Sequence, residues 1–204
     1  MAIPGKIVCV GRNYREHAKE MGNEVPTTPL VFYKPPSSVI ASGEPIVLPA
    51  GVGRVDFEGE IGIVIGERLR KATPAQCAAA VRGIVAVNDV SARELQKSDP
   101  QWWRAKGHDT FCPIGPEKAG HPDLTDLRLE TRVNGQVRQT CHSSDMVFPV
   151  ADLLAFISSA VTLEPGDVVL TGTPEGVGPL NPGDVVEVEV VGWSRVSNPV
   201  VAEA

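Results

Sequence analysis

The sequence has no closely spaced cysteines. Its four cysteines are Cys9, Cys77, Cys112 and Cys141. Zinc ribbons and redox dithiols both need cysteines in C-x-x-C pairs, and no two cysteines here have that spacing. We therefore expect four reduced thiols rather than a zinc or redox site.

Long apolar runs are also missing. The first one, Ile7–Val10, is shorter than the apolar core of a signal peptide. A membrane-spanning helix needs about 18 consecutive apolar residues, and no segment approaches that length. We expect a cytoplasmic protein without a membrane partner.

Basic residues are scattered along the chain, and acidic residues outnumber them. The chain has 19 Lys and Arg against 25 Asp and Glu, which gives a formal net charge of -6. Nucleic-acid surfaces gather Lys and Arg to contact phosphates. A nucleic-acid partner is therefore not expected.

What the sequence does contain is typical of a β-rich globular protein. Its 204 residues include 20 Gly and 18 Pro. A chain of this length can form one core, and abundant Gly and Pro favour short strands joined by turns. We predict one domain over residues 1–204, with a mixed, β-rich α+β fold and a few short helices.

Several segments rich in Val, Ile or aromatic residues predict strands because Gly or Pro bounds each of them. They are Ile7–Val10, Leu30–Tyr33, Ile46–Leu48, Val55–Ile65, Gly83–Val90 and Leu127–Val133. Asn134-Gly135 follows the last segment and predicts a two-residue hairpin, since a type I′ turn needs positive φ at both positions.

Helix signals are fewer. Asn13 and Glu16 form a capping pair that predicts a helix over about 13–21, which Gly22 ends. Thr73 followed by Pro74 predicts a helix through about residue 81. Apolar residues at helical spacing predict a third helix over 150–161.

Acidic residues follow one another along a predicted strand. Asp56, Glu58 and Glu60 fall on one face of it because side chains alternate along an extended chain. Side chains two positions apart lie about 7 Å from each other, so Glu58 and Glu60 can contact one cation. The alternative is an amphipathic strand whose acidic face is merely solvated.

A further carboxylate, Asp89, ends the next apolar strand and precedes a helical pattern over 91–96. It has two interpretations, as a third ligand of the same cation or as the N-terminal cap of the following helix. Ligands that are all oxygens favour Mg²⁺, with Mn²⁺ and Ca²⁺ as alternatives.

Six motifs occur in an order and spacing that match one known enzyme family. They are Cys9–Tyr14 with His17 and Glu20, Phe32–Pro35, Phe57–Glu60, Asp89–Gln96, Arg104–Lys106 and Asp167–Gly178. The sequence therefore resembles the fumarylacetoacetate hydrolase family over about residues 5 to 193. His17 and Glu20 match the acylpyruvase branch of that family.

The resemblance implies a β-roll or sandwich of the fumarylacetoacetate hydrolase type and a homodimer. It implies a small α-keto or β-diketo acid as substrate. The Mg²⁺ ligands that it implies are Glu58, Glu60 and Asp89, with Lys106 beside the metal. Three further positions are implied to face the substrate: Arg93, Gln96 and Thr173.

His17 and Glu20 also make chemical sense as a pair. Residues three apart share a helix face, so Glu20 can hold the imidazole in the tautomer that accepts a proton from water. The alternative is an incidental surface pair, and Lys34 likewise has the alternative of an ordinary surface lysine. Together with the resemblance, the pair predicts a Mg²⁺-dependent hydrolase that converts acylpyruvates, such as acetylpyruvate or fumarylpyruvate, to pyruvate and a carboxylic acid.

Related reactions remain open at this stage. Oxaloacetate decarboxylation and 2-hydroxyhepta-2,4-diene-1,7-dioate isomerisation use the same enolate chemistry, and a non-catalytic metal-binding protein would not need the His–Glu pair. The sequence departs from the family at Asp56-Phe57, in a shortened 96–102 loop and at His108. These departures surround the expected pocket, so they affect substrate identity more than chemistry.

Overall fold

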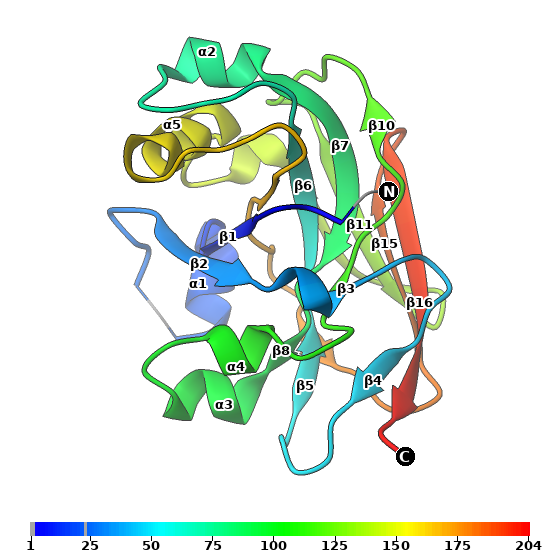
Figure 1. Ribbon diagram of the computed structural model, residues 1–204. Helices are drawn as coiled ribbons and strands as arrows, with labels where there is room; N and C mark the ends of the chain where they lie inside the picture. The colour runs from blue at the N-terminus through cyan, green and yellow to red at the C-terminus, as the bar shows by residue number, and fades with distance from the viewer. Residues whose placement is uncertain (1–2, 23) are drawn as a thin grey trace.

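Two mixed β-sheets form the body of the protein (Figure 1). The computed structural model describes residues 3–22 and 24–204. Met1, Ala2 and Asn23 of the predicted domain lie outside the described residues. The first sheet has the strand order β10-β7-β6-β13-β1-β2. Its strands are β1 (Ile7–Gly11), β2 (Leu30–Lys34), β6 (Gly59–Ile65), β7 (Val81–Asn88), β10 (Lys118–Ala119) and β13 (Val168–Leu170).

The second sheet has the order β12-β11-β15-β16-β4. Its strands are β4 (Ile46–Leu48), β11 (Arg128–Val133), β12 (Gln136–His142), β15 (Val185–Val190) and β16 (Ser194–Ala202). Two smaller sheets accompany the main ones, with the strand orders β14-β5-β8 and β3-β9. Their strands are β3 (Val39–Ile40), β5 (Val55–Phe57), β8 (Ser91–Ala92), β9 (Cys112–Pro113) and β14 (Gly178–Pro179).

The helices are short and lie outside the sheets. They are α1 (Arg15–Glu20), α2 (Pro74–Ala79), α3 (Arg93–Ser98), α4 (Trp103–Lys106) and α5 (Val150–Ala160), with 3-10 turns at Pro36–Ser38 and Ser143–Asp145. Figure 1 shows α2 and α5 together at one end and α3 and α4 together near the other. Among the described residues, no helix is long and apolar enough to cross a membrane.

The largest core lies between the two main sheets and α5. Ile61 and Ile63 of β6 contribute to it from one sheet, Leu129 and Val188 from the other, and Leu153 from the helix. All of these side chains are buried. A second core on the other side of the first sheet contains Cys9 and Cys112. All four cysteines are free, as predicted, and all four are buried.

Local sequence signals identified several elements correctly. Asn134 and Gly135 have φ values of 52° and 76° and connect β11 to β12, so the predicted hairpin is confirmed. Thr73 caps α2 in a reciprocal capping box with Gln76. The mixed, β-rich fold with short helices is also confirmed.

The prediction of one continuous strand over Val55–Ile65 was wrong. The chain leaves the small sheet after β5 and enters the first main sheet at β6, with Glu58 between them. At this junction the Glu58 N–H donates to the side-chain oxygen of Asn88 (3.0 Å) instead of to a backbone oxygen of a neighbouring strand. The predicted apolar face is therefore divided, because Val55 belongs to a different core from Ile61.

The predicted cap of the first helix was also wrong. Helix α1 starts at Arg15 and has no side-chain cap. The Asn13 amide group instead donates to the backbone oxygens of Phe148 (3.1 Å) and Thr171 (2.9 Å). Asn13 thus joins the start of the helix to two distant segments. Gly22 ends the helix with φ 68°, as predicted.

Gly59 sets how closely the two main sheets approach each other at the Glu58–Glu60 segment. A Cβ atom at this position would lie 2.0 Å from Thr131 Oγ1 of β11, far inside contact distance. The buried Gln139 side chain of β12 also accepts a hydrogen bond from the Gly59 N–H (3.0 Å). A glycine is therefore required between the two glutamates.

We predict that Gly59→Ala lowers the free energy of unfolding by about 1–3 kcal/mol, because it overpacks a closed interface. Urea denaturation followed by circular dichroism measures the change. Thr131→Ala removes a hydroxyl that has no hydrogen-bond partner among the described residues, together with a buried methyl group, so alone it should cost only about 1 kcal/mol. Combined with Gly59→Ala it should restore part of the lost stability, and strictly additive effects would contradict the proposed collision.

Candidate active site

Three buried carboxylates meet at one end of the paired strands β6 and β7. Glu58 precedes β6, Glu60 lies on it, and Asp89 follows β7. The antiparallel register pairs Gly59 with Asn88 and so brings the three acids together. One oxygen from each lies within 4.8 Å of the others. The alternative of a solvated acidic face was wrong, since Glu58 and Glu60 are 4% and 1% exposed.

Asp56 does not join this cluster. Its carboxylate binds Arg54 (2.6 Å) and Arg93 (2.7 Å). The alternative role of Asp89 as a helix cap was wrong as well, because α3 starts at Arg93 with Ala92 in the capping position.

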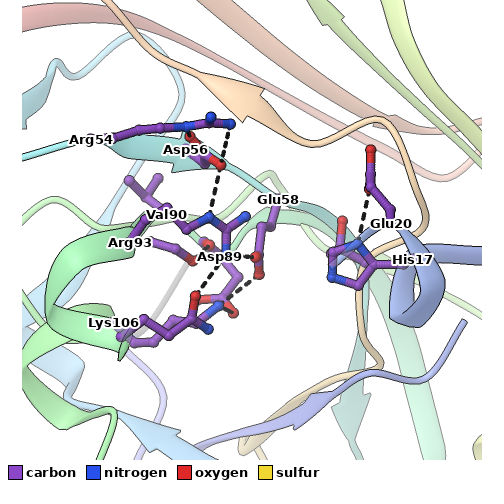
Figure 2. Close-up of polar contacts among 12 residues, drawn as sticks. His17, Glu20, Arg54, Asp56, Glu58, Asp89, Val90, Arg93 and Lys106 are labelled. Atoms are coloured by element: carbon purple, nitrogen blue, oxygen red, sulfur yellow. Dashed lines mark hydrogen bonds and ion pairs between the residues drawn. The ribbon is translucent and has the colours of Figure 1, made fainter. Parts of the chain in front are cut away.

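Two buried lysines and one arginine surround the carboxylates. Figure 2 shows Lys106 and Arg93 beside Glu58 and Asp89. Lys106 Nζ lies 2.6 Å from both Glu58 Oε2 and Asp89 Oδ2. Lys34 Nζ lies 2.7 Å from Asp89 Oδ1, and Arg93 Nη1 lies 2.7 Å from Glu58 Oε1. Lys34 also donates to the backbone oxygens of Val90 and Lys106. The interpretation of Lys34 as a surface lysine was therefore wrong.

The surrounding charges shift the pKa values of the two glutamates in opposite directions. Burial would raise the pKa of Glu58, but Lys106 and Arg93 together hold it well below its usual range. Burial, Asp89 and Glu58 all raise the pKa of Glu60. Among the described residues, no basic side chain lies within ion-pair distance of Glu60, which accepts a hydrogen bond from the Gly172 N–H (2.7 Å). Negative charge is thus least compensated at Glu60.

This arrangement fits a hard divalent cation. The candidate ligands are all carboxylate oxygens, their spacing allows one ion to contact all three, and Glu60 lacks a countercharge. A cation there would remove the repulsion that raises the pKa of Glu60. The residues present therefore suit Mg²⁺ or a similar ion.

His17 of α1 faces the same cavity. Its ring is buried, and Nδ1 lies 3.3 Å from Glu20 Oε2. Figure 2 shows the imidazole on the opposite side of Glu58 from Arg93 and Lys106. The Gly176 N–H donates to both oxygens of Glu20 (3.1 and 3.2 Å), which fixes the carboxylate against the 173–178 loop. His17 is thus a buried residue of the cavity wall, and its role as a base stays a prediction.

The cavity has a volume of about 50 Å³. The predicted site residues that line it are His17, Glu58, Glu60, Asp89, Arg93, Gln96, Lys106 and Thr173. Glu20 lies behind His17. The structure thus brings the predicted site residues together, although they come from segments far apart in the sequence.

The predicted substrate-facing residues also have structural contacts. Arg93 Nη1 donates to Gln96 Oε1 (2.8 Å), which leaves the Gln96 NH₂ group available to a ligand. The Thr173 hydroxyl donates to the Gly59 carbonyl (2.9 Å) and accepts from Gln139 (2.8 Å). Thr173 therefore helps to fix the glutamate segment as well as lining the cavity.

Sequence reasoning missed three features of the site. Helix α4, which carries Lys106, is a single turn without a capping signal. Gln139 lies on a strand whose neighbouring side chains are exposed, so no sequence pattern marked it. Arg12 lines the cavity with a positive φ, which is rare outside glycine.

Two departures from the family pattern lie next to the site. Asp56 holds Arg93 by its ion pair, and Phe57 is part of a core. His108 packs its ring against Phe111, with ring centroids 5.1 Å apart. Burial lowers the pKa of His108.

Comparisons with known proteins give matches over most of the chain. A family model described as "Fumarylacetoacetate (FAA) hydrolase C-terminal" matches residues 6–201. The chain is 46% identical to 5-carboxymethyl-2-hydroxymuconate delta-isomerase from Mycobacterium smegmatis, whose crystal structure superposes with a TM-score of 0.92 over 99% of this chain and 80% of that one.

Two curated relatives have other activities in their names. A 2,4-didehydro-3-deoxy-L-rhamnonate hydrolase from Sphingomonas sp. is 42% identical over 94% of this chain and 72% of its own length. An oxaloacetate decarboxylase from Dictyostelium discoideum is 43% identical over 92% and 89%. The names of these similar proteins thus describe a hydrolase, a decarboxylase and an isomerase.

We predict that Lys34→Met lowers the free energy of unfolding by about 3–5 kcal/mol, because it removes a buried countercharge of Asp89. Urea denaturation measures this change, and saturating Mg²⁺ should recover part of it. The control is Lys19→Met, which breaks an exposed pair with Glu16 and should change stability by less than about 1 kcal/mol. Similar small effects of both substitutions would show that the buried pair is not important for stability.

Proposed function

We propose that this chain, which belongs to the fumarylacetoacetate hydrolase family, cleaves the carbon–carbon bond of acylpyruvates to give pyruvate and a carboxylic acid. Acetylpyruvate and fumarylpyruvate are the expected types of substrate. The observation that supports hydrolysis is the His17–Glu20 pair, which faces a carboxylate cluster across one cavity. Cleavage by water needs a general base beside the substrate, whereas a protein that only binds a metal ion needs none.

The cation that Glu58, Glu60 and Asp89 would hold is most simply Mg²⁺, with Mn²⁺ and Ca²⁺ as alternatives. When bound, it supplies a Lewis acid for the α-keto acid end of the substrate. The three carboxylates keep this charge fixed in a buried position.

His17 is proposed to take a proton from the attacking water. Glu20 accepts the Nδ1–H, so that Nε2 is free to act as the base. Since the Gly176 N–H holds Glu20, the imidazole is oriented before substrate binds. His17 and Glu20 are therefore assigned as a general base and its positioning partner.

Lys106 and Gln96 are proposed to stabilise the oxyanion that water attack creates. Two of the three Lys106 N–H groups reach Glu58 and Asp89, which leaves the third for a substrate oxygen. The Gln96 NH₂ group is likewise available. These donors lie in a buried site, where such bonds are strong.

A second candidate function is the decarboxylation or tautomerisation of oxaloacetate, or a dienoate isomerisation. The names of similar proteins support it, including a mitochondrial oxaloacetate tautomerase of Arabidopsis thaliana. These reactions share the enolate but do not need an activated water. A non-catalytic metal-binding role would leave the His17–Glu20 pair without a purpose.

We further propose that the enzyme works in the cytoplasm as a homodimer on a small α-keto or β-diketo acid. The support is the resemblance to the family and the net negative charge of the chain. Light scattering of the purified protein measures the oligomeric state.

We predict that chelator treatment abolishes turnover and lowers the melting temperature, because the clustered carboxylates lose their shared countercharge. Asp89→Asn should lose activity similarly and should no longer respond to chelator. Differential scanning calorimetry and an absorbance assay of the diketo enol measure the two effects. Full activity after chelation and dialysis would contradict the metal assignment.

We predict that His17→Ala slows acylpyruvate hydrolysis by about 10²-fold or more, the usual effect of losing a general base. Oxaloacetate decarboxylation by the same variant, where present, should fall much less. The control is His142→Ala, since His142 is exposed and lies outside the cavity. Equal losses in both reactions would contradict the role of His17 in activating water.

A further inference from the structure

The positive charges in the cavity wall are not equally available to a ligand. Lys106 is paired with Glu58 and Asp89, and Arg93 with Asp56 and Glu58. Arg12 also lines the cavity. Among the described residues, no carboxylate lies within ion-pair distance of it. Arg93 Nη2 has no hydrogen-bond partner among the described residues, but the charge of Arg93 is offset by its two carboxylates. Arg12 is therefore the arginine of the cavity wall whose charge no described carboxylate offsets.

The backbone at Arg12 is held in an unfavourable conformation. Its φ is 59°, in the left-handed region that few residues other than Gly and Asn adopt. The preceding strand β1 is paired on both sides, with β13 and β2. The side-chain amide of the following residue, Asn13, donates hydrogen bonds to the backbone oxygens of Phe148 and Thr171. The strain is thus imposed from both sides, as is common where a side chain must be aimed into a site.

The neighbouring wall is aromatic. Trp102 packs against Gly11, where a Cβ atom would lie 3.1 Å from its ring. The rings of Trp102 and Phe32 meet edge to face, with centroids 5.4 Å apart. Both residues line the same cavity as Arg12. An ion pair formed beside such a wall is less weakened by water than one on an open surface.

We propose that Arg12 is a specificity-determining residue that binds a second carboxylate of the substrate, so that the enzyme prefers dicarboxylic keto acids to monocarboxylic ones. This inference rests on the proposed function, which assigns the α-keto acid end of the substrate to the carboxylate-bound cation. The planar guanidinium can bind a carboxylate through two hydrogen bonds. Fumarylpyruvate then suits the site better than acetylpyruvate.

The test compares two ligands that the enzyme does not cleave. 2-Oxoglutarate and 2-oxopentanoate have chains of equal length and differ by the terminal carboxylate. Titration calorimetry of the Mg²⁺-loaded wild-type protein should show tighter binding of 2-oxoglutarate. Arg12→Asn, which tolerates positive φ, should reduce that preference by about 10- to 100-fold, the effect of losing one charge-assisted pair. Arg12→Lys should restore part of it.

The control is Arg15→Asn, which removes the same charge from an exposed position on α1. It should leave the preference unchanged. Equal wild-type affinity for both ligands, or an unchanged preference in Arg12→Asn, would overturn the proposal. Equal weakening of both ligands would do so too, since Arg12 would then bind the carboxylate that they share.

Kinetics complete the test. Arg12→Asn should raise KM for fumarylpyruvate and leave KM for acetylpyruvate almost unchanged. Because calorimetry needs no turnover, a wild-type protein that binds 2-oxoglutarate selectively but cleaves neither acylpyruvate would refute the proposed hydrolysis and still support the role of Arg12.

Discussion

The balance of buried charge around Glu58, Glu60 and Asp89 is the constraint on which the rest of the structure depends. Ionised carboxylates are stable in a protein interior only when donors and countercharges surround them. Lys34, Lys106 and Arg93 supply most of that charge, and each comes from a different element. The strand β2 and the helices α3 and α4 are therefore tied to the end of the first sheet by electrostatics as well as by packing.

The same site depends on the second sheet through uncharged groups. Gln139 of β12 bonds to Gly59 and Thr173, and Thr173 bonds in turn to the Gly59 carbonyl. The segment that presents the glutamates is thus held from two directions, by countercharges on one side and by amide and hydroxyl groups on the other. Such support from two directions is what the proposed metal binding and proton transfer would require.

Sequence signals predicted those parts of the fold that depend on neighbouring residues. The Asn134-Gly135 turn and the helix that starts after Thr73 depend on neighbouring residues, and both occur as expected. The break at Glu58 and the burial of Lys34 depend on contacts with residues some 30 to 72 positions away, Asn88, Asp89 and Lys106, and no local pattern contains them. Motif resemblance did identify the three clustered acids, but it did not indicate how their charge is compensated or that Arg12 has no acidic partner among the described residues.

Lys106 pairs with both Glu58 and Asp89, which supplies these acids with a positive charge that belongs to the chain itself. The ammonium group of Lys106 is present as soon as the chain is synthesised, whereas a divalent ion would have to bind from solution. The nascent polypeptide therefore has an internal countercharge with which to fold before any ion arrives. On the proposed function, folding need not await a metal ion, because the ammonium group of Lys106 already offsets part of the buried negative charge.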